Sequence, residues 1–235
     1  MHRLLADLTS AAGISLSREA ERHMKVLRLE EGEEIELFDG KGKSVRCRIA
    51  GGRPVPCGEV AEQRRPESPI TLFACVTKGS RWDWTIEKAT ELGISRIVPV
   101  ISARTIARIA KSERAAKRDR WTRIAEDAAR QSDAKWIPEI LEATDFADAL
   151  KLAKESRCFA GALTDPRPRP LIEAVLAAES AEDYSVFIGP EGDFTPEELS
   201  RLLEFAVPAS FGESILRAET AAIYAISVLM AAKRK

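Results

Sequence analysis

The chain has 235 residues, 45% of them hydrophobic, which is enough apolar material for one large domain or for two smaller domains with their own cores. Charged residues make up 31% and the net charge is −1, which excludes disorder by composition. The cysteines, Cys47, Cys57, Cys75 and Cys158, form no C-x-x-C pair, which argues against a zinc site or a disulfide scaffold. No segment has the roughly 18 consecutive apolar residues of a membrane helix, and residues 1–10 lack the features of a signal peptide. We therefore expect a cytoplasmic protein without a membrane segment or a metal.

The first 67 residues predict a small, β-rich RNA-binding unit. Apolar residues three and four apart between residues 16 and 29 favour a helix. Residues 33–52 then alternate between apolar and polar side chains around a turn at Asp39, as a β-hairpin does. The short strands and glycine turns indicate a small β-barrel, and the charged, proline-containing residues 62–69 are typical of a linker.

From residue 68 onwards the pattern changes to strands that alternate with helices. The strands are apolar throughout, which predicts a parallel sheet covered by helices on both faces, and so an α/β domain over residues 68–235. Strands are expected at residues 70–78, 94–102, 157–165, 184–190 and 208–211, and helices at 82–93, 112–132, 171–179, 195–206 and 218–235.

Three late strands are followed by polar or glycine-containing loops, at residues 163–166, 188–192 and 211–217. Parallel α/β sheets bind ligands beyond the carboxyl ends of their strands, so these loops are the candidate ligand site. The phosphate-binding loops of nucleotide enzymes are absent. Residues 38–44 resemble a P-loop, but a P-loop requires a glycine five residues before Gly42, and Leu37 stands there. No G-x-G-x-x-G follows a strand.

The segment that follows the fourth strand divides into two parts. Thr195, Pro196 and Glu198 form a helix start with a T-x-x-E capping box, which is explained by local structure alone. The preceding Gly189 to Gly192 are not explained in that way. Two glycines around a stiff proline suit either a flat ligand lying against the main chain or an ordinary tight turn, and the pattern leaves both open.

One segment of the nearly neutral chain is basic. Residues 104–123 contain eight Lys and Arg but only two acids, Glu113 and Asp119, which fits either a nucleic-acid contact or a solvated helix face. The two histidines, His2 and His23, are too few for most histidine-based chemistry, and His23 lies in an expected helix, where a structural or RNA-facing role is more plausible than catalysis.

The order of several motifs resembles the SPOUT superfamily of S-adenosylmethionine-dependent RNA methyltransferases, and within it the family that methylates N3 of a uridine in 16S ribosomal RNA. The strongest motifs are “IGPEGDFTPEE” at residues 188–198 and “FGESILRAETAA” at 211–222. “HMKVLRL” with “ELFDGKG” resembles the PUA-like barrel of the family, and residues 78–105 and 120–140 resemble its middle motifs. The resemblance implies a doubly wound parallel sheet with a deep trefoil knot, a homodimer packed through the last helix, and the small ribosomal subunit as partner.

The resemblance also implies the site residues. Residues expected to hold S-adenosylmethionine are Leu163, Thr164, Ile188, Gly189, Pro190, Glu191, Gly192, Phe211, Gly212, Ile215, Leu216 and Arg217. Arg217 is the candidate for holding the base or a phosphate, and Glu219 and Glu191 are alternative proton acceptors, with helix capping an equal explanation for Glu219. RNA contacts are expected from His23, Arg28, Lys78, Arg104, Arg108, Lys111, Arg114, Lys117, Arg118 and Arg120.

Two positions depart from the family pattern. Asp193 replaces a glycine, and Ala134 replaces an arginine that would contact RNA or the active site, a role that Lys135 is placed to take. Two alternative functions therefore stay open: a related knotted methyltransferase acting on a ribose 2′-hydroxyl or another base, and an RNA-binding assembly factor without catalysis.

Overall fold

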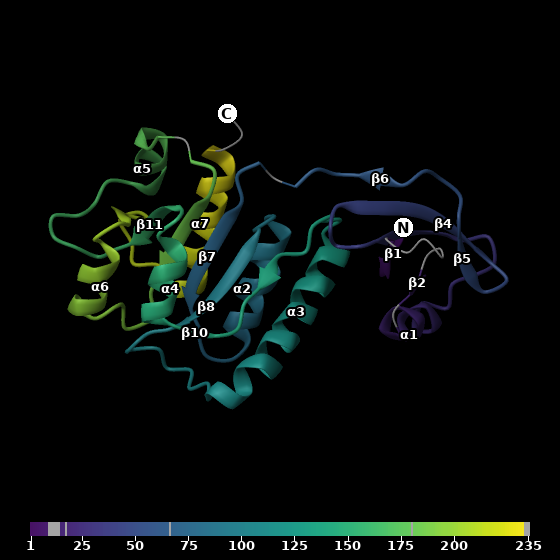
Figure 1. Cartoon of the computed structure of the whole chain (residues 1–235), viewed down its shortest axis with the longest axis horizontal. Helices are drawn as coiled ribbons and strands as arrows, with labels where there is room; N and C mark the ends of the chain where they lie inside the picture. Colours follow the sequence, from purple (N-terminus) through teal and green to yellow (C-terminus); the bar gives the residue numbers. More distant parts are fainter. Residues whose placement is uncertain (9–14, 17, 66, 180, 233–235) are drawn as a thin grey trace. The chain divides into compact units, whose positions relative to one another are not determined.

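The computed structural model describes residues 1–8, 15–16, 18–65, 67–179 and 181–232, which form two compact units (Figure 1). The first unit contains residues 1–65 and 126–137, and the second contains residues 66–125 and 138–235. Residues 126–137, which the sequence placed with the second domain, therefore pack within the first unit.

The first unit is built on one mixed sheet with the strand order β2-β1-β3-β4-β5, and β6 pairs with β4. Its apolar core comes from alternate residues of β1, β3 and β4, against which Met24 and Leu27 of the helix pack. The expected helix is confirmed between Arg18 and Leu27, and Ser17 lies outside the described residues. The elements are β1 (His2–Asp7), β2 (Ser15–Leu16), α1 (Arg18–Leu27), β3 (Glu34–Phe38), β4 (Lys43–Ala50), β5 (Arg53–Pro56) and β6 (Ala61–Glu62).

The glycine-rich turn between β3 and β4 is a hairpin turn, as predicted. The two strands pair antiparallel, and the Asp39 carboxylate accepts hydrogen bonds from the backbone N–H groups of Lys41 and Lys43 at 2.7 and 2.9 Å. Both glycines of the turn have positive φ angles, 67° for Gly40 and 102° for Gly42, which explains why glycine stands there.

A network of buried charges centred on Arg3 holds residues 126–137 in the first unit. Arg3 Nε lies 2.6 Å from Glu36 Oε2, and its Nη1 and Nη2 donate to the carbonyl oxygens of Ala129 and Ala134 at 2.7 and 3.2 Å. Lys135 Nζ reaches the other Glu36 oxygen at 2.6 Å. Lys135 is therefore engaged in this network, and Ala134 contributes its backbone carbonyl to it.

The second unit contains a seven-stranded sheet in which every pair of strands is parallel, which confirms the predicted α/β class. The strand order is β10-β8-β7-β12-β11-β13, and β9 pairs with β8. The strands are β7 (Ile70–Cys75), β8 (Arg96–Ile101), β9 (Glu139–Ile140), β10 (Thr144–Asp145), β11 (Arg157–Gly161), β12 (Tyr184–Ile188) and β13 (Val207–Ala209). The helices are α2 (Ser80–Glu91), α3 (Arg114–Gln131, which ends in the first unit), α4 (Phe146–Ala153), α5 (Leu171–Ala177), α6 (Pro196–Leu202) and α7 (Ala218–Ala232), with a 3₁₀ turn at Lys111–Glu113.

Helices cover both faces of this sheet. Helices α2 and α5 pack against α7, which lies on β7 and β12, while α4 and α6 join a separate apolar cluster with β7, β8, β11 and β12. Alternate residues of β7 serve the two faces, as expected for a strand that is buried on both sides. Helix α4 was not predicted, although its buried residues, Phe146, Ala149, Leu150 and Ala153, have helical spacing.

The last helix is a core element of the second unit. Ala221, Ala222, Ala225 and Leu229 are buried, and their small or apolar side chains allow α7 to approach α2 and the sheet. The interpretation of α7 as an ordinary core helix is therefore confirmed, and its part in a dimer stays a prediction. Residues 233–235 at its expected end lie outside the described residues.

Candidate ligand pocket

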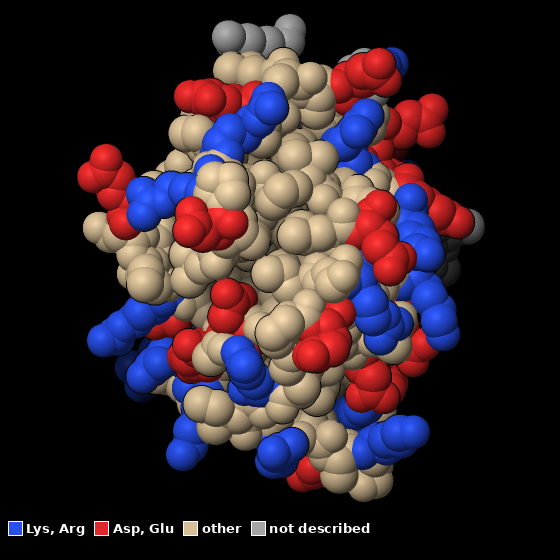
Figure 2. Space-filling view, turned by 90° about the vertical axis from the view of Figure 1, so that its left-hand side faces the viewer, with Lys and Arg blue, Asp and Glu red and all other residues tan. Residues whose placement is uncertain are grey.

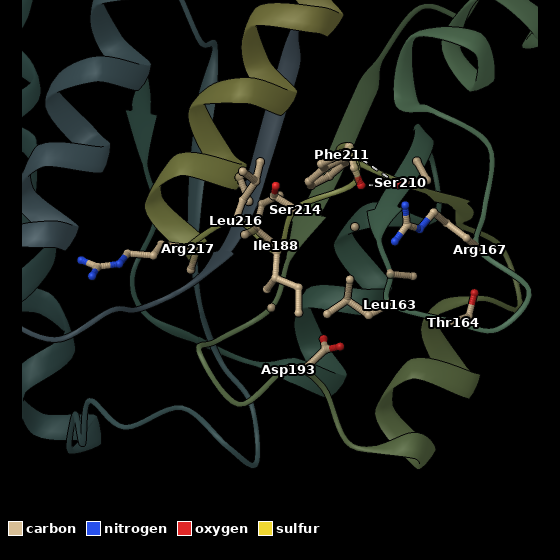
Figure 3. Close-up of a pocket in the computed structure, with 18 of the residues that line it drawn as sticks. Leu163, Thr164, Arg167, Ile188, Asp193, Ser210, Phe211, Ser214, Leu216 and Arg217 are labelled. Carbon is tan, nitrogen blue, oxygen red and sulfur yellow. Dashed lines mark hydrogen bonds between the residues drawn. The ribbon is translucent and has the colours of Figure 1, made fainter.

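A pocket of about 540 Å³ lies at the carboxyl ends of β11, β12 and β13 (Figure 3). These three strands are neighbours in the sheet, in the order β12-β11-β13, so the loops that follow them meet at one edge. The loops come from distant parts of the chain, at residues 161–167, 188–193 and 209–218. The volume falls within the range of roughly 300–1,000 Å³ that is usual for small-molecule sites.

The structure brings together in this pocket all but one of the residues expected to hold a cofactor. The exception is Gly192, which is not part of the lining. The predicted residues that line the pocket are Leu163, Thr164, Ile188, Gly189, Pro190, Glu191, Phe211, Gly212, Ile215, Leu216 and Arg217.

Gly192 has a structural partner outside the pocket. Arg104, which the sequence placed among the RNA contacts, donates from Nη1 to the carbonyl oxygens of Gly192 and Phe194 at 2.8 and 3.3 Å. The guanidinium therefore holds the loop after β12 in place through its main-chain carbonyl groups. Glu198 makes a second connection between these segments, because its Oε1 accepts a hydrogen bond from the backbone N–H of Ala103 at 2.8 Å.

Asp193 lies at a position where the main chain favours glycine. Its φ angle is 57°, in the left-handed region that asparagine and aspartate tolerate better than other side chains. Its Oδ1 accepts a hydrogen bond from the backbone N–H of Phe194 at 2.7 Å, a local bond that stabilises the turn. The glycine of the family pattern and the aspartate of this chain are thus two solutions for the same backbone conformation.

Close packing restricts two other glycines of the pocket. A Cβ atom on Gly161 would lie 2.6 Å from the ring of Phe211, and one on Gly189 would lie 3.0 Å from Asp193 Oδ1. The ring of Phe211 also packs against Tyr224 of α7, with centroids 5.7 Å apart. The missing side chains let the three loops approach one another and leave main-chain groups in the wall of the pocket.

Both basic and acidic side chains line the pocket, and four of them were not among the predicted cofactor residues: Asp165, Arg167, Asp193 and Glu213. Arg167 extends from the loop after β11 toward the cavity, whereas Arg217 extends away from it (Figure 3). Arg167 donates a long hydrogen bond, 3.5 Å, to the carbonyl oxygen of Glu213. The sequence signal was its position, since Arg167 follows directly on the polar loop at the end of an expected strand.

The two candidate proton acceptors occupy different environments. Glu191 lines the pocket, and its side chain is 27% exposed. Glu219 lies in the first turn of α7 with a side chain that is 12% exposed, and it is not part of the lining. Its Oε2 atom is buried without a hydrogen-bond partner among the described residues.

Several of the predicted RNA-binding residues are engaged in ion pairs. Arg114 pairs with Asp145 at 2.5 Å, Arg118 with Glu142 at 3.1 Å, and Arg120 grips both oxygens of Asp83. Half of the basic segment therefore links elements of the second unit together. The remaining predicted contacts include four exposed side chains, Arg28, Lys78, Arg108 and Lys111, and two that are half-buried, His23 and Lys117.

Neither a metal centre nor a membrane helix is found within the described ranges. No group of three His, Cys, Asp or Glu side chains gathers closely enough there to hold a metal ion. The helices in those ranges are too short or too polar to cross a bilayer. The four cysteines are free thiols.

A parallel α/β sheet with a loop-walled pocket at its carboxyl edge, joined to a small mixed-sheet unit, defines an enzyme-like architecture with a separate binding module. The comparisons with known proteins identify the class. Residues 64–230 match the RNA methyltransferase domain, and residues 16–54 match the PUA domain of RNA methyltransferases. The chain belongs to this RNA methyltransferase family.

Relatives with curated names cover nearly the whole chain. The ribosomal RNA small subunit methyltransferase E of Bacillus subtilis is 29% identical over 97% of this chain and 96% of its own length. The protein of the same name from Aquifex aeolicus is 31% identical over 91% and 92%.

Solved structures of two relatives contain S-adenosylmethionine. The structure of the ribosomal RNA small subunit methyltransferase E of Neisseria gonorrhoeae, bound to S-adenosylmethionine, matches with a TM-score of 0.81 at 29% identity. The match covers 98% of this chain and 97% of that one. A methyltransferase from Legionella pneumophila in complex with the same cofactor has a TM-score of 0.79 at 32% identity, over 92% and 90%.

Proposed function

We propose that this protein transfers a methyl group from S-adenosylmethionine to N3 of a specific uridine in 16S ribosomal RNA, in the cytoplasm and on the assembled small subunit. The observation that carries the proposal is the convergence of the three late loops in one pocket, in a chain that matches both domains of the family in order. The names of the relatives support the substrate class.

The residues of the pocket fit the cofactor. Apolar side chains such as Leu163, Ile188 and Leu216 suit a flat adenine, and the glycine-bracketed loop offers main-chain groups at close range. When bound, S-adenosylmethionine supplies a methyl group on a sulfonium leaving group. The chain has to orient the uracil in line with that methyl group and to accept the proton that N3 carries, because protonated N3 has no free in-plane lone pair. Glu191 and Glu219 are the two proposed acceptors.

N3 lies on the pairing edge of uracil, so the target base has to be unpaired or extruded. We assign RNA contacts to the PUA domain and to the exposed basic residues Lys78, Arg108 and Lys111. Because such contacts are largely electrostatic, RNA affinity should fall with increasing salt.

A homodimer and the trefoil knot complete the proposal. Two apolar side chains on the pocket loops, Leu163 and Ile215, are 66% and 80% exposed, which is unusual for large apolar residues. The face of the second unit seen in Figure 2 carries a broad area without charged side chains, with charged residues around it. A second copy of the chain that covers the rim of the pocket would explain this exposure, and sedimentation analysis tests it.

The decisive experiment incubates the purified protein with isotope-labelled S-adenosylmethionine and small subunits from cells that lack the enzyme, followed by nucleoside analysis. Labelled 3-methyluridine is expected. A 2′-O-methylated or differently methylated nucleoside would support the related-methyltransferase alternative. RNA binding without any labelled product, together with no cofactor binding in calorimetry, would support an assembly factor. Free 16S RNA serves as the comparison that tests whether assembly is required.

A further inference from the structure

Arg81, at the start of α2, lies between the two glutamates that are candidates for proton transfer. Its Nη1 is 3.5 Å from Glu191 Oε1, and its Nε is 3.9 Å from Glu219 Oε1. The three residues come from three separate elements: α2 follows β7, Glu191 stands in the loop after β12, and Glu219 stands in the first turn of α7. Arg81 thus links the loop after β12, which forms one wall of the pocket, to the first turn of α7.

The environment of Glu219 makes this bridge significant. Its side chain is 12% exposed, and one carboxylate oxygen is buried with no hydrogen-bond partner in the described part of the chain. A buried carboxylate without compensation is unfavourable, and unsatisfied buried polar groups in native proteins usually have a functional explanation. Among the ion pairs of the described residues, Arg81 supplies the only cation within 4 Å of Glu219.

Glu191 depends on Arg81 far less. Its side chain is more exposed than that of Glu219, so water can solvate its charge if the arginine is removed. A partly exposed ion pair of this kind contributes little to stability. Two different nitrogens of the planar guanidinium nevertheless lie nearest the two carboxylates, an arrangement that the single ammonium nitrogen of lysine does not reproduce.

We propose that Arg81 is a positioning residue for methyl transfer, which acts through Glu219 by fixing the carboxylate at the start of α7. The proposal rests on the proposed function. Glu219 comes directly after Arg217 and Ala218, which line the pocket. A shift of its carboxylate therefore moves the segment that forms one wall of the pocket. Arg81 itself is outside the lining and need not touch the reacting atoms.

The test is a double-mutant cycle on the full-length protein, with kcat, KM for small subunits and cofactor affinity measured for each variant. Arg81→Ala is expected to lower kcat by about 10- to 100-fold, the scale of losses from misplaced catalytic groups. KM and the cofactor Kd should change by less than roughly 3-fold if the arginine positions and does not bind. Arg81→Lys should recover only part of kcat, because it restores the charge but not the planar fork.

The double variant tests whether the effect of Arg81 on the rate depends on Glu219. If Arg81 acts through Glu219, Arg81→Ala combined with Glu219→Gln is no slower than Glu219→Gln alone. If the two losses multiply, the proposal is overturned. A multiplied loss with a higher KM, and a salt dependence of RNA binding reduced by about one charge, would instead identify Arg81 as a direct phosphate contact.

Arg96 provides the matched control. Its side chain is 47% exposed, as is that of Arg81, and it pairs with Glu139 at 2.7 Å, but it stands at the start of β8, at the end of the strand opposite the pocket loops. Arg96→Ala should leave kcat within about 2-fold. A wild-type protein without methylation activity would overturn the proposed function and this role with it. An active wild type with multiplicative losses would overturn the role of Arg81 alone.

Discussion

Each unit of this protein holds a largely buried charged side chain, Arg3 in the first and Glu219 in the second, and their surroundings differ. In the first unit, Arg3 is surrounded by partners: Glu36, two backbone carbonyl oxygens, and the ring of Phe38 at 4.2 Å. In the second unit, Glu219 has one distant cation and one oxygen with no partner among the described residues. The difference teaches that burial alone does not identify a functional charge. A satisfied charge holds structure together, whereas an unsatisfied one is available for chemistry.

The same contrast appears in how the surroundings act on the charge. Burial by itself raises the pKa of the Glu36 carboxyl, but hydrogen bonds from Lys135, Arg3 and Ser44 outweigh it, so that the pKa lies below its ordinary value. Glu36 is therefore an anion that the fold has fully compensated. Its network joins β3 to the segment at residues 126–137, far away in sequence.

The largest expected effect comes from the uncompensated charge. Glu219→Gln should reduce methyl transfer by about 100- to 10,000-fold, the usual contribution of a proton-transferring group. The free energy of unfolding should change by less than about 1 kcal/mol, because the ion pair with Arg81 that is lost is long and partly exposed. Single-turnover rates and urea unfolding measure the two effects. Unchanged turnover in a destabilised variant would show that Glu219 has a capping role and would remove it from the mechanism.

The compensated charge should give the opposite result. Glu36→Gln removes the buried anion that Arg3 and Lys135 share and leaves them only the exposed carboxylate of Asp133, so it is expected to destabilise the protein by about 3 kcal/mol. Glu34→Gln is the matched control on the same strand, since its pair with Arg48 is exposed to solvent and should contribute little to stability. Chemical unfolding at neutral pH compares the two. Equal losses would mean that burial of the network contributes nothing.

Acidification should sharpen the distinction. Because the pKa of Glu36 is lowered by folding, its stabilising contribution is present above the pKa of the unfolded chain and is lost as the pH falls through the lower, folded value. The stability difference between the wild type and Glu36→Gln should therefore shrink as the solution becomes acidic. Unfolding curves collected from neutral to acidic pH test this. A difference that stays constant down to the lowest pH would contradict the assignment.

The smallest effect is expected at Asp193, whose charge has a purely local partner. Asp193→Gly keeps the left-handed conformation available and should alter stability by less than about 1 kcal/mol. Asp193→Ala loses the bond to the Phe194 N–H and retains a side chain in an unfavourable region, so it should be the more damaging change by about 1 kcal/mol. Thermal unfolding of both variants gives the order. The reverse order would show that the carboxylate has a partner beyond its own turn.

Local patterns in the sequence were sufficient wherever neighbouring residues decide the structure. The capping box at the start of α6 is present as predicted: Thr195 Oγ1 accepts from the Glu198 N–H, and Glu198 Oε2 accepts from the Thr195 N–H. The hairpin at Asp39 and the alternation of strands and helices were likewise predictable. Helix α4 is absent from the expected elements, although the apolar spacing of its buried residues is helical.

Long-range partners were beyond the sequence. Nothing near Arg120 or Arg104 indicates that one pairs with Asp83 and the other binds the carbonyl of Gly192. Both residues were therefore interpreted as RNA contacts from their charge alone. In the same way, helix packing decides that Glu219 Oε2 has no hydrogen-bond partner in the described part of the chain and that Arg81 lies beside this carboxylate. No local sequence pattern encodes that packing.

The sequence by itself determined the α/β class, the family resemblance and the three loops that line the pocket. It did so because strand periodicity, helix caps and glycine requirements are set by residues that are close together in the chain. Only the tertiary structure decided which charges are compensated, since a buried arginine or glutamate finds its partners on elements up to 131 residues away, as Arg3 does with Ala134. Burial removes water as a competitor, so those distant partners alone determine whether a charge stabilises the fold or remains available to the pocket.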